Sequence, residues 1–496
     1  MPGFHIEHFG CRAARADGEA IGGRLRATGL FEEQARQADV VVVNTCSVTA
    51  EADRQARAFI RRAHRNNPAA KIVVTGCYAQ RAPEEIAAIA GVAAVVGNSH
   101  KALAPEIVLS LTRSSGLTRV AEPQHAAAMV SVSSLLAGGV PVWADDRFAH
   151  SFLEEAQLIP GQQTRPNLKI QEGCGNRCTF CVIPQTRGSS RSLPHAAVMR
   201  QVEGFIAAGG GELVISGINL GRWGRDLERN PTLADPHELP LQRTEGRVPE
   251  YTFAGLVRAI LEQTALPRLR LSSIEPMDWT DELIALMADY GGTRLARHAH
   301  LPLQSGSDAV LRRMHRRYRP WHYAQKIEAL LRAAGPELTL GADVMAGFPG
   351  ETDAEFEETM ALIRALPFGY LHLFPFSPRP GTRGWALHAG NPVPPQVVEE
   401  RMAALRALAA EKTATHRCQF IGRELEAITL HTPAALAVRG FTSALTENFL
   451  HVEMAAQFPS NELMRVRVTG LNAEGVLEAE TLAASDAALA ATSCLN

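Results

Sequence analysis

Three cysteines between Cys174 and Cys181 have the spacing of an iron–sulfur ligand set. They occupy the stretch Cys174-Gly-Asn-Arg-Cys178-Thr-Phe-Cys181, directly after a segment that we predict to be a strand. Three thiolates at this spacing can bind three irons of a [4Fe–4S] cube and leave the fourth iron open for a small chelating ligand. The alternative is a structural zinc site. Zinc takes a fourth ligand, usually from a second CxxC or a His pair, and none follows nearby.

A second set of cysteines is spread over the first eighty residues. Cys11, Cys46 and Cys77 each follow a short apolar run that predicts a parallel strand. Because the carboxyl ends of parallel strands share one edge of a sheet, these thiols are expected to converge although they are far apart in the chain. The alternative is three unrelated buried cysteines, since cysteine is among the most buried residue types. Cys418 and Cys494 have no partner motif, and we interpret both as non-ligands.

The composition is that of a folded, reducing-compartment protein. The chain has 496 residues, 46% hydrophobic and 21% charged, with a net charge of −2. These values exclude a largely disordered chain, and eight cysteines are too few for a disulfide scaffold. No signal peptide and no convincing apolar span are found, so we expect a cytoplasmic protein that does not enter a membrane. Nucleic acid, if bound, must be bound through local basic patches.

The elements that position these cysteines predict an α/β protein of several parts. Strand and helix patterns alternate over the first hundred residues: Phe4–Phe9, Val40–Val43 and Lys71–Thr75 as strands, and Asp17–Leu30, Ala50–His64 and Pro83–Ala90 as helices. From Asn167 onward six further βα units predict a partial (βα)6, TIM-like barrel. Its strands are expected at Leu168–Gln171, Glu212–Ser216, Arg268–Leu271, His298–Leu303, Leu338–Met345 and Tyr370–Phe374.

The C-terminal part predicts a small all-β, OB-like barrel. Its strands are expected at Glu424–Leu430, Leu436–Thr442, Phe449–Met454, Leu463–Thr469 and Gly475–Thr481, after a long helix at Val397–Arg417. We divide the chain into a cluster domain at 1–110, a linker at 111–160, a barrel domain at 161–395, a connecting helix at 396–417, a β-barrel at 418–485 and a tail at 486–496. Residues 224–250 are expected to form an insertion loop.

The CxxxCxxC stretch at the first βα turn of such a barrel resembles the radical S-adenosylmethionine family. Phe180 matches the aromatic residue that this family carries just before the third cysteine. The resemblance implies that S-adenosylmethionine chelates the open iron and is cleaved by an electron from the cluster to a 5′-deoxyadenosyl radical. In this interpretation Cys174, Cys178 and Cys181 are the catalytic cluster ligands.

Nearly the whole chain resembles the methylthiotransferases within that family. The matches include Asn44–Thr49, Thr75–Gln80, Ile183–Ser192, Ser216–Gly221, Arg270–Pro276, Leu303–Asp308, Gly347–Glu351 and Phe374–Thr382. The resemblance implies a second [4Fe–4S] cluster on Cys11, Cys46 and Cys77, where a sulfur is held and methylated. It also implies an unidentified electron donor, an unidentified sulfur source, and a TRAM-like RNA-binding module at the C-terminus.

The same segments provide candidate cofactor contacts at the strand ends of the barrel. Glycines there let backbone approach a ligand, and hydroxyls, amides and carboxylates can bind its ammonium, hydroxyl and adenine groups. The candidates are Phe180, Ser216, Gly217, Asn219, Ser273, Glu275, Gln304, Gly347, Phe348 and Glu351. Two departures from the family pattern stand out: Arg12-Ala13-Ala14 replaces the usual Asn after the first cysteine, and Gln185 replaces an aromatic residue.

Candidate RNA contacts are arginines of the barrel domain. From Cys418 onward the chain has four arginines, no lysine and nine acidic residues, so this part is a poor electrostatic anchor for phosphates. Basic residues gather elsewhere: Arg187 and Arg191 beside the cluster loop, and Arg312, Arg313, Arg316, Arg317 and Arg319 after a predicted strand. The alternative is a solvated helix face whose arginines pair with glutamates.

The substrate rests on resemblance alone. Arg270–Pro276 and His372–Ser377 look most like the branch that adds a methylthio group to C2 of N6-threonylcarbamoyladenosine at position 37 of tRNA. The alternatives are the same reaction on N6-isopentenyladenosine of tRNA, or on an aspartate of a ribosomal protein. A different class, a non-catalytic iron–sulfur RNA-binding protein, would need the cysteines but not the cofactor turns. DNA is not an expected partner.

Overall fold

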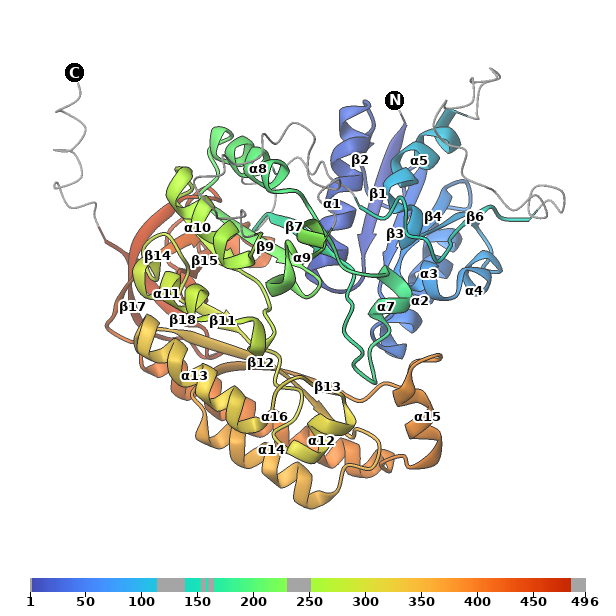
Figure 1. The fold of residues 1–496 in the computed structure, drawn as a ribbon. Coiled ribbons are helices and arrows are strands. Elements are labelled where there is room, and N and C mark those ends of the chain that lie inside the picture. The colour runs from blue at the N-terminus through green and yellow to red at the C-terminus, as the bar shows by residue number, and fades with distance from the viewer. Residues whose placement is uncertain (1, 114–138, 153–157, 159–164, 230–250, 483–496) are drawn as a thin grey trace, which may run out of the picture.

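The N-terminal part is a parallel six-stranded sheet with helices on both faces (Figure 1). This computed structural model describes residues 2–113, 139–152, 158, 165–229 and 251–482. The strand order is β2-β1-β3-β4-β5-β6. The strands are β1 (Gly3–His8), β2 (Phe31–Glu32), β3 (Val40–Thr45), β4 (Lys71–Gly76), β5 (Val92–Gly97) and β6 (Val142–Trp143). The predicted strands at β1, β3 and β4 are confirmed, whereas β2, β5 and β6 were not predicted.

Helices α1 (Arg12–Ala27) and α5 (Ala104–Arg113) pack on one face of this sheet, and α2 (Ala50–Asn66), α3 (Cys77–Arg81) and α4 (Pro83–Ala87) lie on the other. Valines of the central strands point to both faces, so the strands are apolar throughout, as parallel strands covered twice must be. The predicted start of the first helix at Asp17 is wrong. Because Ala13 and Ala14 are buried, the helix already begins beside Cys11.

The middle part is an open six-stranded barrel, as predicted. Its strands are β7 (Asn167–Glu172), β9 (Glu212–Gly217), β10 (Arg268–Leu271), β11 (His298–His300), β12 (Thr339–Ala346) and β13 (Phe368–Pro375). Hydrogen bonds join β10 to the β11 region, from Ala296 N to Leu269 O at 2.9 Å and from Ile274 N to His300 O at 3.0 Å. Among the strands that the structure describes, β7 and β13 do not pair, so the barrel stays open on that side.

Helices cover the outside of this barrel, and their apolar side chains pack against the strands in one large hydrophobic core. They are α8 (His195–Ala207), α10 (Phe253–Gln263), α11 (Asp281–Tyr290), α12 (Asp308–Arg313), α13 (Pro320–Ala334) and α14 (Asp353–Ala365). A short strand β8 (Arg191–Ser192) pairs with β7 after the cysteine loop and α7 (Ile183–Arg187). Of the predicted insertion at 224–250, the structure describes α9 (Arg225–Arg229), and residues 230–250 lie outside the described residues.

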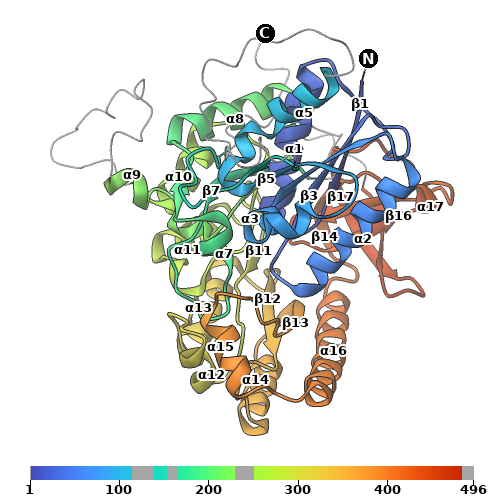
Figure 2. The same ribbon diagram turned by 90° about the vertical axis from the view of Figure 1, so that its right-hand side faces the viewer.

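A long helix, α16 (Pro395–Cys418), leads into a closed five-stranded barrel, as predicted (Figure 2). The strands are β14 (Glu424–Thr429), β15 (Thr442–Thr446), β16 (His451–Met454), β17 (Leu463–Leu471) and β18 (Leu477–Thr481). The predicted strand at Leu436–Thr442 is wrong. Pro433 caps a helical turn, α17 (Ala434–Ala437), and Gly440 has a positive φ of 82°, so the strand begins only at Thr442.

Acidic residues of the C-terminal barrel bind arginines of the middle barrel. Glu426 pairs with Arg268 at 2.9 Å and Glu447 pairs with Arg297 at 2.6 Å. Arg270 also donates to the backbone carbonyl of Thr446 at 3.1 Å. The two barrels are therefore joined through charge. No helix among the described residues has the length and apolar content that a membrane crossing requires.

His416 at the end of α16 gives the fold a pH dependence. Its Nε2 lies 2.8 Å from Thr339 Oγ1, and burial, followed by the charge of Arg417, lowers its pKa to about 4. The unfolded chain, with a pKa near 6.5, binds this proton first, so the contribution is complete above pH 6.5 and is lost as the pH falls towards 4. Between pH 7 and pH 5 we expect a loss of about 2 kcal/mol from this residue.

The measurement is denaturant unfolding at pH 7 and pH 5 for wild type and His416→Gln. Because other buried histidines titrate in the same direction, the informative quantity is the difference between the two proteins. His416→Gln should lose less stability on acidification than wild type. An identical loss in both proteins would contradict the assignment.

Candidate functional site

The N-terminal cysteines lie together at the carboxyl edge of the parallel sheet, as the strand pattern predicted. Cys11 precedes α1, Cys46 follows β3, and Cys77 begins α3 directly after β4. Burial, followed by the charges of Cys77 and Cys11, raises the pKa of Cys46 to about 12. Gly10 permits this approach, because a Cβ there would lie 2.5 Å from Cys46 Cβ. Three converging thiols at one edge fit an iron–sulfur cluster, and metal binding would displace their protons.

The second set of cysteines forms the loop between β7 and α7. Burial is the main reason that the pKa of Cys181 is raised to about 12, and the charges of Cys178 and Cys174 act in the same direction. Burial also raises the pKa of Cys174, where Cys178 and Glu275 add to the effect. The three thiols therefore lie within electrostatic reach of one another. This donor set fits a cluster with three protein ligands, and the loop opens into a cavity.

That cavity has a volume of about 340 Å³ and is lined by the cysteine loop and by charged residues from three other loops. Its lining consists of Gly175, Asn176, Arg177, Cys178, Arg222, Glu275, His315, Arg316 and Arg317. Of the predicted cofactor residues only Glu275 lines it. Arg222 and His315 were not predicted, because neither belongs to a motif at a strand end.

Arg316, predicted to contact RNA, is instead placed against the cysteine loop. It is buried, its Nη1 lies 3.3 Å from Cys178 Sγ, and its Nη2 pairs with Glu275. The charges of Tyr318, Glu275 and Cys178 overcome the effect of burial and hold the pKa of Arg316 above its usual value. A fixed cation thus stands against a sulfur of the predicted cluster.

Two predicted cofactor residues carry buried polar atoms that lack a partner. Ser216 Oγ is buried without a hydrogen bond, and so are both side-chain polar atoms of Asn219. Asn219 also holds a left-handed backbone conformation, with φ of 58°. Buried polar groups are nearly always paired, so these atoms are the kind that a bound polar ligand would satisfy. Ser216 lies near the carboxyl end of β9 and Asn219 follows that strand, which pairs with β7.

The remaining predicted cofactor residues are spread over other strand ends. Glu351 accepts from Gly347 N at 2.8 Å and pairs with Arg401, while Phe348 packs against Phe376 at 5.4 Å. These contacts shape the turn after β12. Phe180 is half-buried on the barrel core, Gly217 packs against Gln171, Gln304 has a φ of 63°, and Ser273 is half-buried after β10.

A buried group of five charged side chains joins the N-terminal domain to the barrel; we call it the interface network. It consists of Asp17, Lys101, Lys169, Glu172 and Arg187, none more than 4% exposed. Lys101 contacts Asp17 at 3.0 Å and also Glu172, whereas Lys169 contacts Glu172 at 2.6 Å and also Asp17. Three cations and two anions leave an excess of one positive charge.

Arg187 extends this network to the N-terminal thiols and is not available to RNA, contrary to its predicted role. It is fully buried and its Nη1 contacts Glu172 at 2.7 Å and Asp17 at 3.1 Å. Burial opposes its charge, but Cys77, Glu172, Asp17 and Cys11 hold its pKa well above the usual value. Asn98 adds a second link, donating to Cys77 Sγ at 3.3 Å and to Thr186 O at 2.9 Å.

The two departures in the family pattern are also placed by the structure. Gln185 Nε2 donates to Gly381 O at 2.8 Å, so it ties α7 to the loop after β13. Ala14 is buried and its carbonyl accepts from Asn44. Arg12 is half-buried and forms no ion pair with any described residue.

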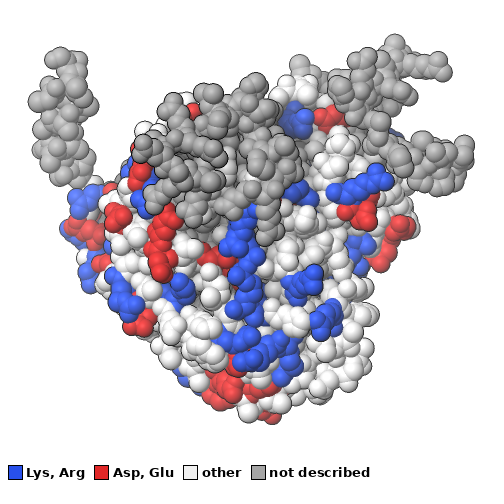
Figure 3. All heavy atoms as spheres, in the orientation of Figure 1, with Lys and Arg blue, Asp and Glu red and all other residues white. Residues whose placement is uncertain are grey.

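The other predicted RNA-contacting arginines are largely paired. Arg313 binds Glu355 at 2.7 Å, Arg312 and Arg319 both bind Asp308, and Arg191 lies over Phe148. Arg317 is 44% exposed, with Asp278 at 3.4 Å. Figure 3 shows lysine and arginine atoms gathered between α9 and α12, beside the described cysteine loop. The exposed arginines of this region are Arg177, Arg225, Arg312, Arg317 and Arg383.

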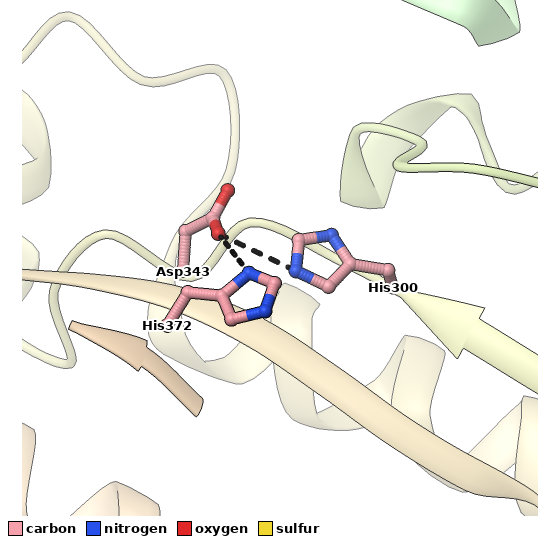
Figure 4. Close-up of side chains that lie close together, drawn as sticks. All are labelled: His300, Asp343 and His372. Carbon is pink, nitrogen blue, oxygen red and sulfur yellow. Dashed lines mark hydrogen bonds and ion pairs between the residues drawn. The ribbon is translucent and has the colours of Figure 1, made fainter. Parts of the chain in front are cut away.

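A cluster of side chains that sequence reasoning missed lies on the inner face of β11, β12 and β13 (Figure 4). His300 Nε2 and His372 Nδ1 approach the same oxygen of Asp343, at 3.4 Å and 3.3 Å. Hydrogen bonds and charges from both rings outweigh burial and lower the pKa of Asp343. The three ligand atoms lie within 4.8 Å of one another, so the set could hold a cation. Their separation in sequence left no motif to find.

Three cysteines after the first strand of an open parallel barrel, with a cavity beside them, are the arrangement expected of a radical S-adenosylmethionine enzyme. Residues 168–363 match the Radical SAM superfamily, and residues 3–97 match the uncharacterized protein family UPF0004. The chain resembles a solved structure of the radical S-adenosylmethionine methyltransferase TsrM from Kitasatospora setae, with a TM-score of 0.47, 14% identity and coverage of 76% of this chain and 75% of that one.

Relatives from bacteria match along most of their length. The threonylcarbamoyladenosine tRNA methylthiotransferase MtaB of Bacillus subtilis strain 168 is 34% identical, over 90% of this chain and 89% of its own. The tRNA-2-methylthio-N(6)-dimethylallyladenosine synthase of Cereibacter sphaeroides is 32% identical, over 97% of this chain and 98% of its own. The chain belongs to the methylthiotransferase family of radical S-adenosylmethionine enzymes, and its cofactors are S-adenosylmethionine and [4Fe–4S] clusters.

The interface network gives a stability prediction. Asp17→Asn removes one of its two anions and leaves three buried cations against Glu172 alone, which we expect to cost about 3–5 kcal/mol. The measurement is denaturant unfolding of the protein without clusters. Glu51→Gln is the matched control, because Glu51 is half exposed and pairs with Arg54 on the surface, where the loss should stay within about 0.5 kcal/mol. Equal effects of the two substitutions would contradict the role of the network.

Proposed function

We propose that this enzyme inserts a methylthio group at C2 of N6-threonylcarbamoyladenosine at position 37 of tRNA. The observation that carries the proposal is the presence of two groups of three cysteines at two sheet edges, in a chain whose relatives include enzymes named for that reaction. When bound, the clusters and S-adenosylmethionine supply a carbon-centred radical and a methylated sulfur. The protein itself must hold these reagents apart and present the base between them.

In this proposal the cysteines hold the two clusters, and other residues bind the cofactor. Cys174, Cys178 and Cys181 hold the radical cluster at the mouth of the barrel, and Cys11, Cys46 and Cys77 hold the second cluster. Ser216 and Asn219 bind the cofactor with their unpaired polar atoms, and Glu275 faces it across the cavity. The turn from Gly347 to Glu351, directly after β12, contributes backbone groups to the same site.

Fixed cations support both sets of thiolates. Arg316 donates to Cys178 Sγ, and Arg187 lies within electrostatic reach of Cys77 and Cys11. Positive charge beside a thiolate stabilises its deprotonated, metal-binding form. Each arginine is held by carboxylates, Arg316 by Glu275 and Arg187 by Asp17 and Glu172, so its orientation does not depend on the clusters.

The tRNA would approach the face on which the exposed arginines gather, with the reaction taking place in the cytoplasm. An electron donor and a sulfur source must also act, and both remain to be identified by experiment. The second candidate function is the same reaction on N6-isopentenyladenosine, favoured by the relatives that carry the dimethylallyladenosine name.

The substrate is tested by mass spectrometry of nucleosides from bulk tRNA, with and without the gene. Deletion should remove 2-methylthio-N6-threonylcarbamoyladenosine and accumulate its precursor without the methylthio group. Restoration by wild type and not by a Cys46→Ala variant is the matched control. Loss of the isopentenyl counterpart would move the assignment to the second candidate. No change in either nucleoside would overturn the tRNA assignment.

The cluster assignment is tested by iron content and cofactor cleavage of anaerobically reconstituted protein. Cys178→Ala should lose about half of the bound iron and all formation of 5′-deoxyadenosine, because its set holds only one of the two clusters. Cys46→Ala should lose a similar amount of iron yet still form 5′-deoxyadenosine. Cys418→Ala, at an exposed cysteine outside both sets, is the control and should retain all iron. Cleavage retained in Cys178→Ala would contradict the assignment.

A further inference from the structure

Two half-buried arginines form no ion pair with any residue that the structure describes. Arg12 follows Cys11 directly, and Arg165 precedes β7. Arg165 Nη1 is buried without a hydrogen bond, and neither side chain forms an ion pair with a described residue. Burying a guanidinium without an anion is costly, so such a side chain is expected to acquire one from a ligand.

These arginines lie where all three parts of the protein meet. The Arg165 guanidinium lies 5.2 Å from the centre of the Phe449 ring, and that of Arg270 lies 5.5 Å from the same ring. Phe449 comes from the C-terminal barrel and stacks on His298 of β11 at 4.2 Å. The N-terminal domain contributes Arg12, which is close enough to Tyr370, Arg270 and Glu212 for their charges to act on it.

The charges around this junction do not balance. Glu212 is already bound by Arg270, at 2.6 Å, and by Arg268, while Asp343 is engaged by His300 and His372. Arg12 and Arg165 therefore add two positive charges that form no ion pair with a described carboxylate, although the charge of Glu212 acts on both. Burial, followed by the charges of Arg12 and Arg270, lowers the pKa of Arg165 to about 9, as expected for cations forced together.

The inner face of β13 gives access to this junction. Tyr370, His372 and Phe374 alternate along the strand and so share one face. The His372 side chain is 56% exposed and Phe374 is 39% exposed. Tyr370 lies 5.3 Å from Phe449, so the exposed part of the strand leads inward to the arginines.

We infer that Arg12 and Arg165 form the subsite for the carboxylate of the threonylcarbamoyl group on the substrate base. The inference rests on the proposed function. C2 and C6 of adenine both flank N1, so a group on N6 lies on the same edge of the base as the carbon that receives sulfur. A base whose C2 faces the cluster on Cys11 thus brings its N6 substituent towards Arg12. A planar guanidinium binds a carboxylate through two parallel hydrogen bonds.

The same subsite discriminates against the neutral alternative. An isopentenyl group has no charge, and placing it against Arg12 and Arg165 would leave both guanidinium groups without an anion. The anion could also come from a phosphate of the RNA backbone, which Arg binds with the same geometry. The two sources differ in one respect: only the carboxylate disappears when the base is unmodified.

The experiment measures equilibrium binding of the reconstituted, full-length enzyme to two transcripts of one tRNA. One carries N6-threonylcarbamoyladenosine at position 37 and the other carries plain adenosine. Arg165→Gln should weaken binding of the modified tRNA about tenfold and leave binding of the unmodified tRNA unchanged. Arg165→Lys, which keeps the charge but lacks the planar fork, should fall between wild type and Arg165→Gln.

Arg12→Gln provides a second test if Arg165→Gln fails to fold, and its iron content is checked first because Cys11 is adjacent. Arg332→Gln, which removes one exposed arginine of a surface pair, controls for loss of net charge and should affect neither tRNA. Equal weakening of both tRNAs would assign the arginines to phosphate and overturn the inference, as would no weakening of either. Wild type that leaves the modified tRNA without a methylthio group would instead refute the proposed function.

Discussion

The buried interface network is the constraint on which the arrangement of the two cysteine sets depends. Its charges cross between the domains in both directions: Lys101 of the N-terminal domain binds Glu172 of β7, and Lys169 of β7 binds Asp17 of α1. Separating the domains would break the ion pairs that hold these five buried charges. Because α7 follows Cys181 and ends at Arg187, the same network fixes the barrel loop against the N-terminal cysteines.

Each of the two sets of thiols has a buried arginine near it. Arg187 lies within electrostatic reach of Cys77 and Cys11, and Arg316 contacts Cys178, each buried and each held by carboxylates. Burial, together with the charges of neighbouring cysteines, raises the pKa of Cys46 and Cys181, which opposes the charged form that binds metal. A fixed cation offsets that cost. This explains why these two arginines are withdrawn from the surface, where the sequence had suggested contacts with RNA.

The sequence predicted those parts of the structure that follow from local pattern. Alternating apolar runs located the six barrel strands, and the topology of parallel strands was enough to bring Cys11, Cys46 and Cys77 together. Prediction from sequence failed where the role of a residue depends on whether its side chain is buried. A run of arginines has the same letters whether its members face solvent, as Arg312 does, or a sulfur, as Arg316 does. His300, Asp343 and His372 come from three strands, so only the assembled barrel shows that they meet.

The acidic C-terminal barrel is explained by docking and not by RNA affinity. Glu426 and Glu447 bind Arg268 and Arg297, so part of its negative charge is used to attach it to the middle barrel. What it contributes in return is Phe449, which lies against the Arg165 and Arg270 guanidinium groups and the His298 ring. Aromatic and cationic groups packed in this way are shielded from water, which strengthens any hydrogen bond made there to an anion. In the proposed arrangement the module therefore forms one wall of the substrate site, while the exposed arginines between α9 and α12 make the phosphate contacts.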